Sequence, residues 1–158
     1  MSTDALPEAP KYCLVTLSSE EIVQKWSELS PLIACSLPPI FTSSPALMSN
    51  FLAATQTGAI ELHVFGTENG QLLPLALVGT MIFNDGFSGS KNMVIVCLTA
   101  LKDLNRPDVW SKGMDLLKHV AKTRGCLSIL AYSNVRSIIE LIKSLGGTAE
   151  FTLLKIGV

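Results

Sequence analysis

The stretch Asp108-Val109-Trp110-Ser111-Lys112-Gly113 follows an apolar run over residues 93–101 and opens a helical pattern that reaches Arg124. The start of a helix after a strand is a natural anion site, because free backbone N–H groups and the positive end of the helix dipole converge there. Glycines at such a start let a phosphate approach the backbone closely. This stretch keeps one glycine, Gly113, and carries a carboxylate, Asp108, that would repel an anion. The plainer alternative is that Asp108 only caps the helix.

Composition narrows the class of protein. The chain has 158 residues, of which 48% are hydrophobic and 16% are charged, which suits one globular domain. We expect that domain over residues 11–158, after an N-terminal arm over residues 1–10. The net charge of −1 includes no block of like charges, so nucleic acid is not an expected partner.

The sequence predicts neither a membrane-spanning helix, nor a signal peptide, nor a metal site. The apolar runs fall short of the roughly 20 residues that a membrane-spanning helix needs. The arm has no basic start and no apolar core, so we expect no secretion by a signal peptide. The four cysteines lie far apart and form no C-x-x-C pair, and the two histidines lie near no such pair, so no metal site is expected.

The order of the elements follows from periodicity, capping residues and turns. Asn69-Gly70 between apolar runs indicates a hairpin, and a strand-helix-strand-helix-strand ending requires crossovers, so one pair of strands should be parallel. The fold class is therefore α/β (α+β), with a mixed sheet. In chain order we first expect a strand over 11–17, a helix from the capping box Ser18 and Glu21 to Ser30-Pro31, and a helix from Ser44-Pro45 to Thr57. A meander of strands over 60–65, 72–83 and 93–101 follows. The chain then continues with a helix over 108–124, a strand over 127–132, a helix led by Asn134 and ending at Gly146, and a strand over 148–156.

This order of elements resembles the GNAT superfamily of N-acetyltransferases. The run from Gly113 to Val120 is similar to the one after that superfamily's last motif glycine, and residues 134–146 are similar to its asparagine-led helix ending in Leu-Gly. The resemblance implies a mixed central sheet with an antiparallel meander, one splayed parallel strand pair and about four helices. Acetyl-CoA would enter the gap between the strands over 93–101 and 127–132.

The resemblance also implies which residues would contact acetyl-CoA. The backbone of the first strand of the gap would face the pantetheine arm, and the N–H groups at the helix start would face the pyrophosphate. The residues in question are Cys97, Leu98, Thr99, Ser111, Lys112, Gly113, Met114 and Asn134.

Departures from the superfamily weaken the case for catalysis. Aligned on Gly113, the chain has Asp108 where the superfamily has Gln or Arg, and Ser111 where it has a first glycine. Many relatives place a tyrosine before the Leu-Gly pair to protonate the leaving thiolate, and Ile142 stands there in this chain. Isoleucine has no proton to give.

Substitutes for the missing acid and base are few. Tyr132, at a strand end, could donate a proton, although packing alone would also explain it. Glu61 or Asp103 could serve as general base by position, although isolated carboxylates are usually solvated surface groups. No acid and base pair stands out.

A narrower resemblance concerns Trp110, residues 121–126 and Leu145-Gly146-Gly147. These features resemble the small acetyltransferase-like proteins encoded in tailed-phage structural gene clusters. That likeness implies a non-catalytic virion or assembly component without a cofactor, which acts through protein contacts in the host cytoplasm or in the virion. Its arm, residues 1–10, would dock on a partner such as another virion protein, and self-association is a further option.

Two functions therefore compete. One is this non-catalytic protein, and the alternative is a divergent acetyl-CoA-dependent N-acetyltransferase acting on a small-molecule or protein amine. A third option is a module that binds another small ligand in the same gap. An open gap favours ligand binding, whereas Trp110 and Met114 are the side chains expected to plug a closed one.

Overall fold

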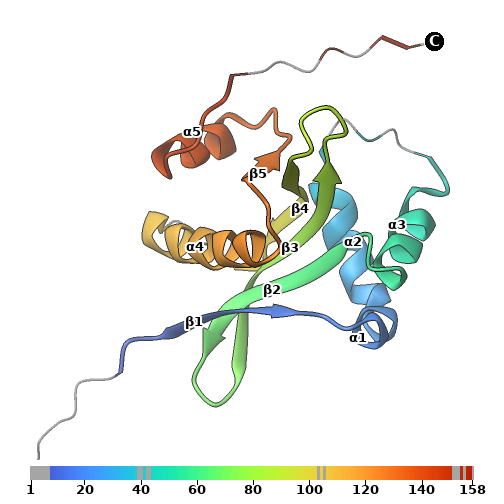
Figure 1. Cartoon of the computed structure of the whole chain (residues 1–158). Coiled ribbons are helices and arrows are strands. Elements are labelled where there is room, and N and C mark those ends of the chain that lie inside the picture. The colour runs from blue at the N-terminus through green and yellow to red at the C-terminus, as the bar shows by residue number, and fades with distance from the viewer. Residues whose placement is uncertain are drawn as a thin grey trace, which may run out of the picture.

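The computed structural model describes residues 8–38, 41, 44–102, 104, 106–150, 154, 156 and 157. Its elements, labelled in Figure 1, are β1 (Lys11–Thr16), α1 (Ser19–Gln24), α2 (Trp26–Ser36), α3 (Leu47–Gln56), β2 (Glu61–Glu68), β3 (Leu72–Asn84), β4 (Lys91–Ala100), α4 (Pro107–Thr123), β5 (Ser128–Ala131) and α5 (Arg136–Ser144).

The strands form one sheet in the order β1-β2-β3-β4-β5. The first four strands pair antiparallel, and β5 pairs parallel to β4. The predicted mixed sheet, with an antiparallel meander and one parallel pair, is confirmed. The β2–β3 hairpin turns at Gly70, whose backbone φ angle is +78°. Glycine adopts this left-handed conformation without strain, which explains why it follows Asn69 there.

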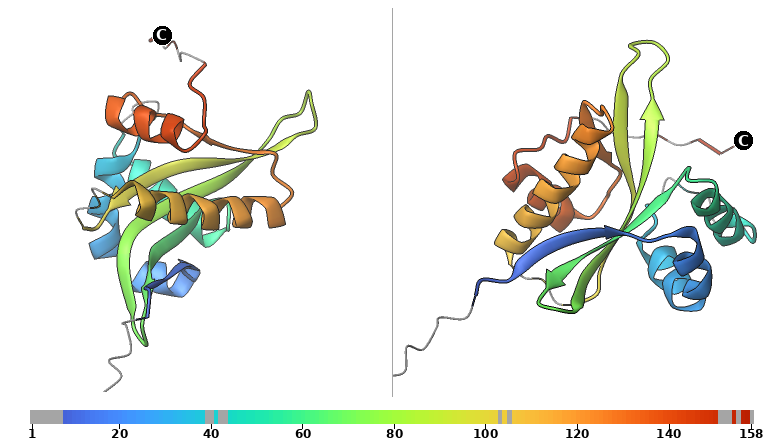
Figure 2. Two further views of the ribbon diagram at one scale, coloured as in Figure 1. Left: turned by 90° about the vertical axis from the view of Figure 1, so that its left-hand side faces the viewer. Right: turned by 60° about the horizontal axis from the view of Figure 1, so that its bottom comes forward.

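Helices cover both faces of the sheet (Figures 1 and 2). α1, α2 and α3 lie on one face, and α4 and α5 lie on the other. Side chains alternate along β4 accordingly: Val94 packs toward α1–α3, whereas Met93 and Ile95 pack toward α4. The core on the α1–α3 side comprises Ile22, Leu29, Ile33, Phe51, Leu62, Leu77, Val94, Val96 and Cys97.

The N-terminal helices differ from the prediction. The capping box is confirmed, because the N–H of Ser18 donates to Glu21 and the N–H of Glu21 donates to Ser18 Oγ. The predicted end at Ser30-Pro31 is wrong, since α2 runs through Pro31 to Ser36. Burial of Leu29 and Ile33 on either side of the proline favours the helix there. The break falls earlier, at Lys25, so the described residues contain five helices, in line with the about four that were predicted.

Three predicted helix starts differ from the observed ones. α3 begins at Leu47 with Ala46 as its N-cap, so Ser44-Pro45 belongs to the preceding turn. α5 has Val135 as its N-cap in place of Asn134, because Ser133 Oγ accepts the N–H of Val135 in a local turn. α4 has Arg106 as its N-cap, and Asp108 lies two residues further on, in the first turn. The alternative that Asp108 is the N-cap is therefore wrong.

The final strand predicted over 148–156 is not seen in the described residues 148–150, 154 and 156, which form no regular element. The other residues of that span lie outside the described part of the chain.

Candidate functional site

The parallel strands β4 and β5 separate halfway along β4. They pair only from Asn92 with Ser128 to Ile95 with Ala131. Beyond Ile95, β4 continues to Ala100 with β3 on one side and no strand of the described residues on the other. The predicted splayed pair is therefore confirmed.

A β-bulge marks the point of separation. On β3, Gly79 pairs with Cys97 and Thr80 pairs with Ile95, which leaves Val96 without a partner. An extra residue of this kind bends its strand and increases the local twist. The bulge therefore turns β4 away from β5 and leaves the backbone of residues 96–100 as an unpaired edge.

A cleft of about 580 Å³ opens beside this edge. Its walls come from β4, β5, α4, α5 and the C-terminal end of α2, together with a few residues of β1, β2 and β3. The residues that line it are Leu14, Cys35, Ser36, Leu37, Pro38, Phe65, Ala76, Val78, Ile95, Val96, Cys97, Leu98, Thr99, Ala100, Trp110, Gly113, Met114, Leu117, Ala131, Tyr132, Ser133, Asn134, Val135, Ile138, Leu141, Ile142 and Leu145.

Trp110 and Met114 form part of the wall and do not plug the gap. Both side chains are half-buried. The indole Nε1 of Trp110 donates to the carbonyl of Leu104 at 2.9 Å, which holds the ring in place at the start of α4. The gap is therefore open.

Most of the residues named from the sequence meet in the cleft. Those that line it are Cys97, Leu98, Thr99, Gly113, Met114, Tyr132 and Asn134. Ser111, Lys112 and Glu61 lie outside its described lining, and Asp103 lies outside the described residues.

The backbone role expected of residues 111–114 does not fit the structure. α4 begins at Pro107, so Ser111 is its fifth residue. From there on, each N–H donates within the helix and is not free to meet a phosphate. Gly113 instead allows close packing, because a Cβ placed there would lie 3.3 Å from the ring of Phe65.

The negative charge of Asp108 is compensated. Arg106 Nη2 lies 2.7 Å from its Oδ2, and Arg106 Nε lies 3.3 Å from its Oδ1. Hydrogen bonds from Arg106 lower the pKa of Asp108, so the carboxylate is ionised within an ion pair. This pair borders a separate, shallow depression next to Tyr12 and Lys112. The repulsion that Asp108 was predicted to exert on an anionic ligand is thus offset by Arg106. The sequence analysis had not assigned a role to this arginine.

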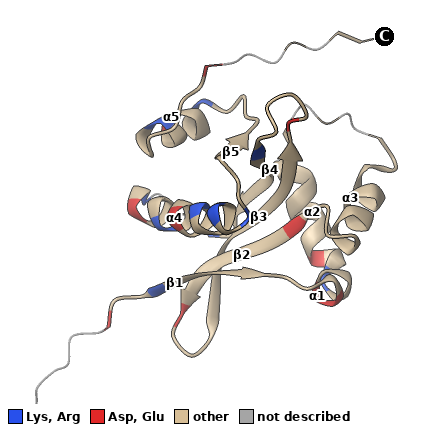
Figure 3. Cartoon of the chain, viewed as in Figure 1, with Lys and Arg blue, Asp and Glu red and all other residues tan. Residues whose placement is uncertain are grey.

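The described lining of the cleft contains no Asp, Glu, His, Lys or Arg. Charged residues gather on the helices and near the strand ends, as Figure 3 shows. The titratable groups in the lining are Tyr132, Cys35 and Cys97. Burial raises the pKa of Cys97 to about 12, so its thiol stays protonated at neutral pH and is a poor nucleophile.

The sequence analysis missed one part of the cleft and anticipated only Ile142 in another. Residues 35–38 close one end, but the helix predicted there stopped at Pro31. α5 covers another side with Ile138, Leu141, Ile142 and Leu145, none of which is fully buried. These four positions share one face by helical spacing, but such spacing is equally expected of a face that packs on the core, so it does not show that the face borders a cavity.

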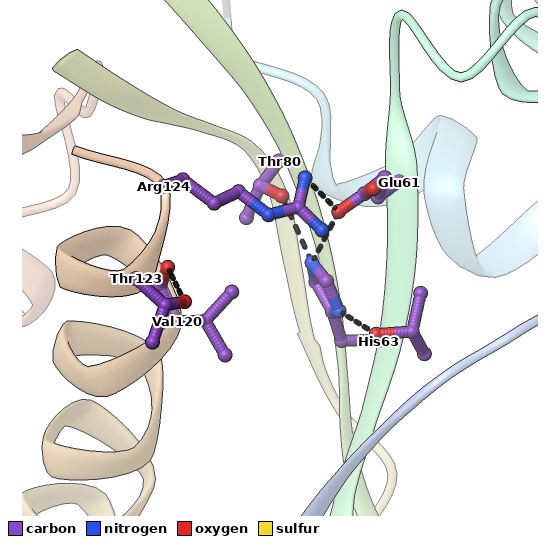
Figure 4. Close-up of polar contacts among 7 residues, drawn as sticks. Glu61, His63, Thr80, Val120, Thr123 and Arg124 are labelled. Atoms are coloured by element: carbon purple, nitrogen blue, oxygen red, sulfur yellow. Dashed lines mark hydrogen bonds and ion pairs between the residues drawn. The ribbon is translucent and has the colours of Figure 1, made fainter. Parts of the chain in front are cut away.

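Glu61 belongs to a second polar group, drawn in Figure 4, and is outside the described lining of the cleft. His63 is fully buried, and its Nδ1 and Nε2 each lie 2.9 Å from a threonine hydroxyl, Thr16 and Thr80 respectively. Arg124 Nη1 lies 2.7 Å from Glu61 Oε2. Glu61 is engaged in this ion pair and lies outside the described lining, so its predicted role as general base is not supported by its position.

No protein-family model matches the chain, and no curated protein sequence matches it. Solved structures do. An acetyltransferase of Trypanosoma brucei matches with a TM-score of 0.61 and 15% identity, over 94% of this chain and 100% of that one. An aminoglycoside N-acetyltransferase in complex with CoA matches with a TM-score of 0.67 and 11% identity, over 98% and 99%.

A third match is the ribosomal-protein-alanine N-acetyltransferase of Brucella melitensis, with a TM-score of 0.65 and 13% identity over 93% of this chain and 99% of that one. At such identities the likeness is one of fold. The chain therefore has the GNAT acetyltransferase fold predicted from its order of elements. In the described residues no helix combines the length and apolar character needed to cross a membrane.

Proposed function

We propose that the chain is an acetyl-CoA-dependent N-acetyltransferase whose cleft between β4 and β5 receives the pantetheine arm. The observation that carries this proposal is the unpaired edge of β4, residues 96–100, facing an open cleft. An exposed strand edge has free N–H and C=O groups that pair with an added peptide-like segment. The pantetheine arm contains amide groups suited to such pairing.

The residues present fit this ligand. The edge around Cys97, Leu98 and Thr99 would hold the amides, and the apolar walls at Gly113 and Met114 would contact the methylene groups. The amide side chain of Asn134 lies at the same cleft. The exposed cation of Lys112, beside the start of α4, offers charge for the phosphates.

Acetyl-CoA supplies the acyl group as a thioester. In the proposed reaction an N–C bond forms to the acceptor amine and the C–S bond breaks. Tyr132 gives its phenolic proton to the departing sulfur and regains one released from the nitrogen, so protons balance. Tyr132 is the proposed donor because Ile142, which takes the place of the usual tyrosine, lines the same cleft without a proton to give.

Ligand-induced stabilisation tests this proposal. Acetyl-CoA at 100 times its dissociation constant should raise the free energy of unfolding by about 2.7 kcal/mol. Ala131→Leu, which fills the cleft from β5, should remove the effect. His119→Leu on the exposed side of α4 is the matched control and should keep it. Absence of stabilisation in the unsubstituted protein would refute the proposal.

A second candidate is a protein of this fold that works through protein contacts without catalysis. It is favoured by the uncharged described lining, which offers no general base, and by Ile142. Binding of acetyl-CoA without turnover of any amine would support it. Docking on a phage virion through residues 1–10 and self-association stay predictions; residues 1–7 lie outside the described part of the chain.

A further inference from the structure

The cleft has walls that disfavour a charged acceptor. Its described lining contains no carboxylate and no imidazole, and most of its side chains are aliphatic or aromatic. An ammonium ion in such surroundings loses its hydration without gaining a countercharge, which is costly. Backbone carbonyls of the β4 edge can accept hydrogen bonds from an ammonium, but they cannot neutralise it or take its proton.

The same lining restricts the chemistry. An alkyl amine resembles lysine, whose ordinary pKa is about 10.4, and is therefore protonated at neutral pH. A protonated amine has no lone pair for attack until a base removes the proton. Since the described lining provides no carboxylate or histidine for that step, the amine that fits this cleft must enter already unprotonated.

Two aromatic side chains favour an aromatic acceptor. The half-buried Trp110 and the 45% exposed Tyr132 border the cleft, whereas the third ring of its lining, Phe65, is only 2% exposed and belongs to the core. Trp110 is held by its hydrogen bond to Leu104. The indole therefore offers a flat apolar surface to a planar ligand at little entropic cost, and the Tyr132 ring adds a second apolar surface.

We propose that the acceptor is an apolar aromatic amine, whose nitrogen is unprotonated at neutral pH because its lone pair is delocalised into the ring. This inference rests on the proposed acetyl transfer for its chemistry, but acceptor binding can be measured separately. In the transfer, the nitrogen forms the N–C bond, the C–S bond breaks, and the proton lost by nitrogen is balanced by the one gained by sulfur.

Calorimetric titration with a matched pair of probes tests the inference. At pH 7, 2-naphthylamine is neutral and 2-naphthylmethylamine is an ammonium ion of nearly the same shape. With the full chain saturated with CoA, we expect 2-naphthylamine to bind at least tenfold more tightly. Equal or tighter binding of 2-naphthylmethylamine would overturn the inference, and so would failure of both probes to bind.

A charge placed in the cleft provides a second arm. Ile138→Glu puts a carboxylate on the half-buried face of α5 that lines the cleft, and should reverse the preference toward 2-naphthylmethylamine. Ser137→Glu adds the same charge at the neighbouring exposed position, outside the described lining, and should leave the preference unchanged. A reversal by both variants, or by neither, would overturn the inference.

The two proposals can fail separately. Titrations repeated without CoA show whether the aromatic amine binds by itself. Tight binding of 2-naphthylamine in a protein that acetyl-CoA does not stabilise would support the acceptor class and refute the acetyl transfer. Stabilisation by acetyl-CoA with a preference for the ammonium probe would do the reverse.

Discussion

Nη1 of Arg124 lies 2.7 Å from Oε2 of Glu61, and this ion pair connects the C-terminal end of α4 to the first residue of β2. The same carboxylate oxygen is 3.8 Å from Nε2 of the buried His63. It is itself buried and has no well-aligned hydrogen bond among the described groups, so the nearby guanidinium is its main compensation. The pair therefore fixes the helix to the sheet on the side away from the proposed ligand.

Removing Arg124 should destabilise the fold more than removing an ordinary surface arginine. Arg124→Ala removes the cation paired with the buried Glu61 oxygen, and because the guanidinium is partly exposed we expect a loss of about 1–2 kcal/mol in the free energy of unfolding. The matched control is Arg136→Ala, whose exposed pair with Glu140 is worth about 0.3–0.5 kcal/mol. Urea denaturation measures both, and equal losses would show that burial of the first pair is unimportant.

Acid should weaken the fold through His63. Burial lowers the pKa of His63, and the charge of Arg124 lowers it further, against an opposing effect of Glu61. Both ring nitrogens are occupied by threonine hydroxyls, so the neutral ring is well satisfied. Because the unfolded state binds the proton more readily, stability falls as pH drops through the ordinary value near 6.5 and levels off below the depressed folded value.

Denaturation from pH 8 to pH 5 checks this direction. Each unit of pKa depression corresponds to about 1.4 kcal/mol lost in acid. His63→Gln, which keeps two hydrogen-bonding groups, should flatten this part of the profile, whereas His119→Gln at an exposed position on α4 should not. An unchanged profile in the His63 variant would assign the acid sensitivity elsewhere.

Local signals predicted the order of the elements because they act within a few residues. Asn69-Gly70 marked the β2–β3 turn, and Gly125, with φ 73, ends α4 while the N–H of Cys126 donates to Ala121. The helix end predicted at Pro31 is wrong because the local cost of the proline is outweighed by burial of Leu29 and Ile33, which depends on tertiary packing.

The site was harder to predict because it depends on geometry between distant segments. The bulge at Val96 separates β4 from β5, yet neither neighbour of Val96 in the sequence is a glycine or a proline. Gly79 lies opposite the bulge on β3, but this pairing joins segments that are distant in the sequence. Gly113 was interpreted as a phosphate-loop glycine, although its position in α4 relates it to Phe65. The compensation of Asp108 by Arg106 spans only two residues, but it depends on where the helix begins.

The cysteines should differ in reactivity. Cys35 is exposed at the cleft, whereas Cys97 is buried with its pKa raised to about 12. Iodoacetamide at pH 8 should therefore label Cys35 readily and leave Cys97 unmodified in the folded chain. Peptide mass spectrometry measures both sites, and unfolding in urea should make Cys97 reactive. If acetyl-CoA occupies the cleft, it should slow labelling of Cys35, whereas unchanged labelling would place the ligand elsewhere.

Tyr132→Phe tests the proposed proton donor. The substitution removes one hydroxyl from the cleft wall and keeps the ring, so binding of acetyl-CoA should persist while kcat falls by about 100-fold, the lower end of the usual effect of a general acid. Tyr12→Phe is the matched control, because the other tyrosine of the chain stacks on Phe65 and does not line the cleft. Steady-state kinetics with an aromatic amine separate kcat from KM. A variant that binds acetyl-CoA and turns over at the original rate would remove Tyr132 from the mechanism and leave protonation of the thiolate to solvent.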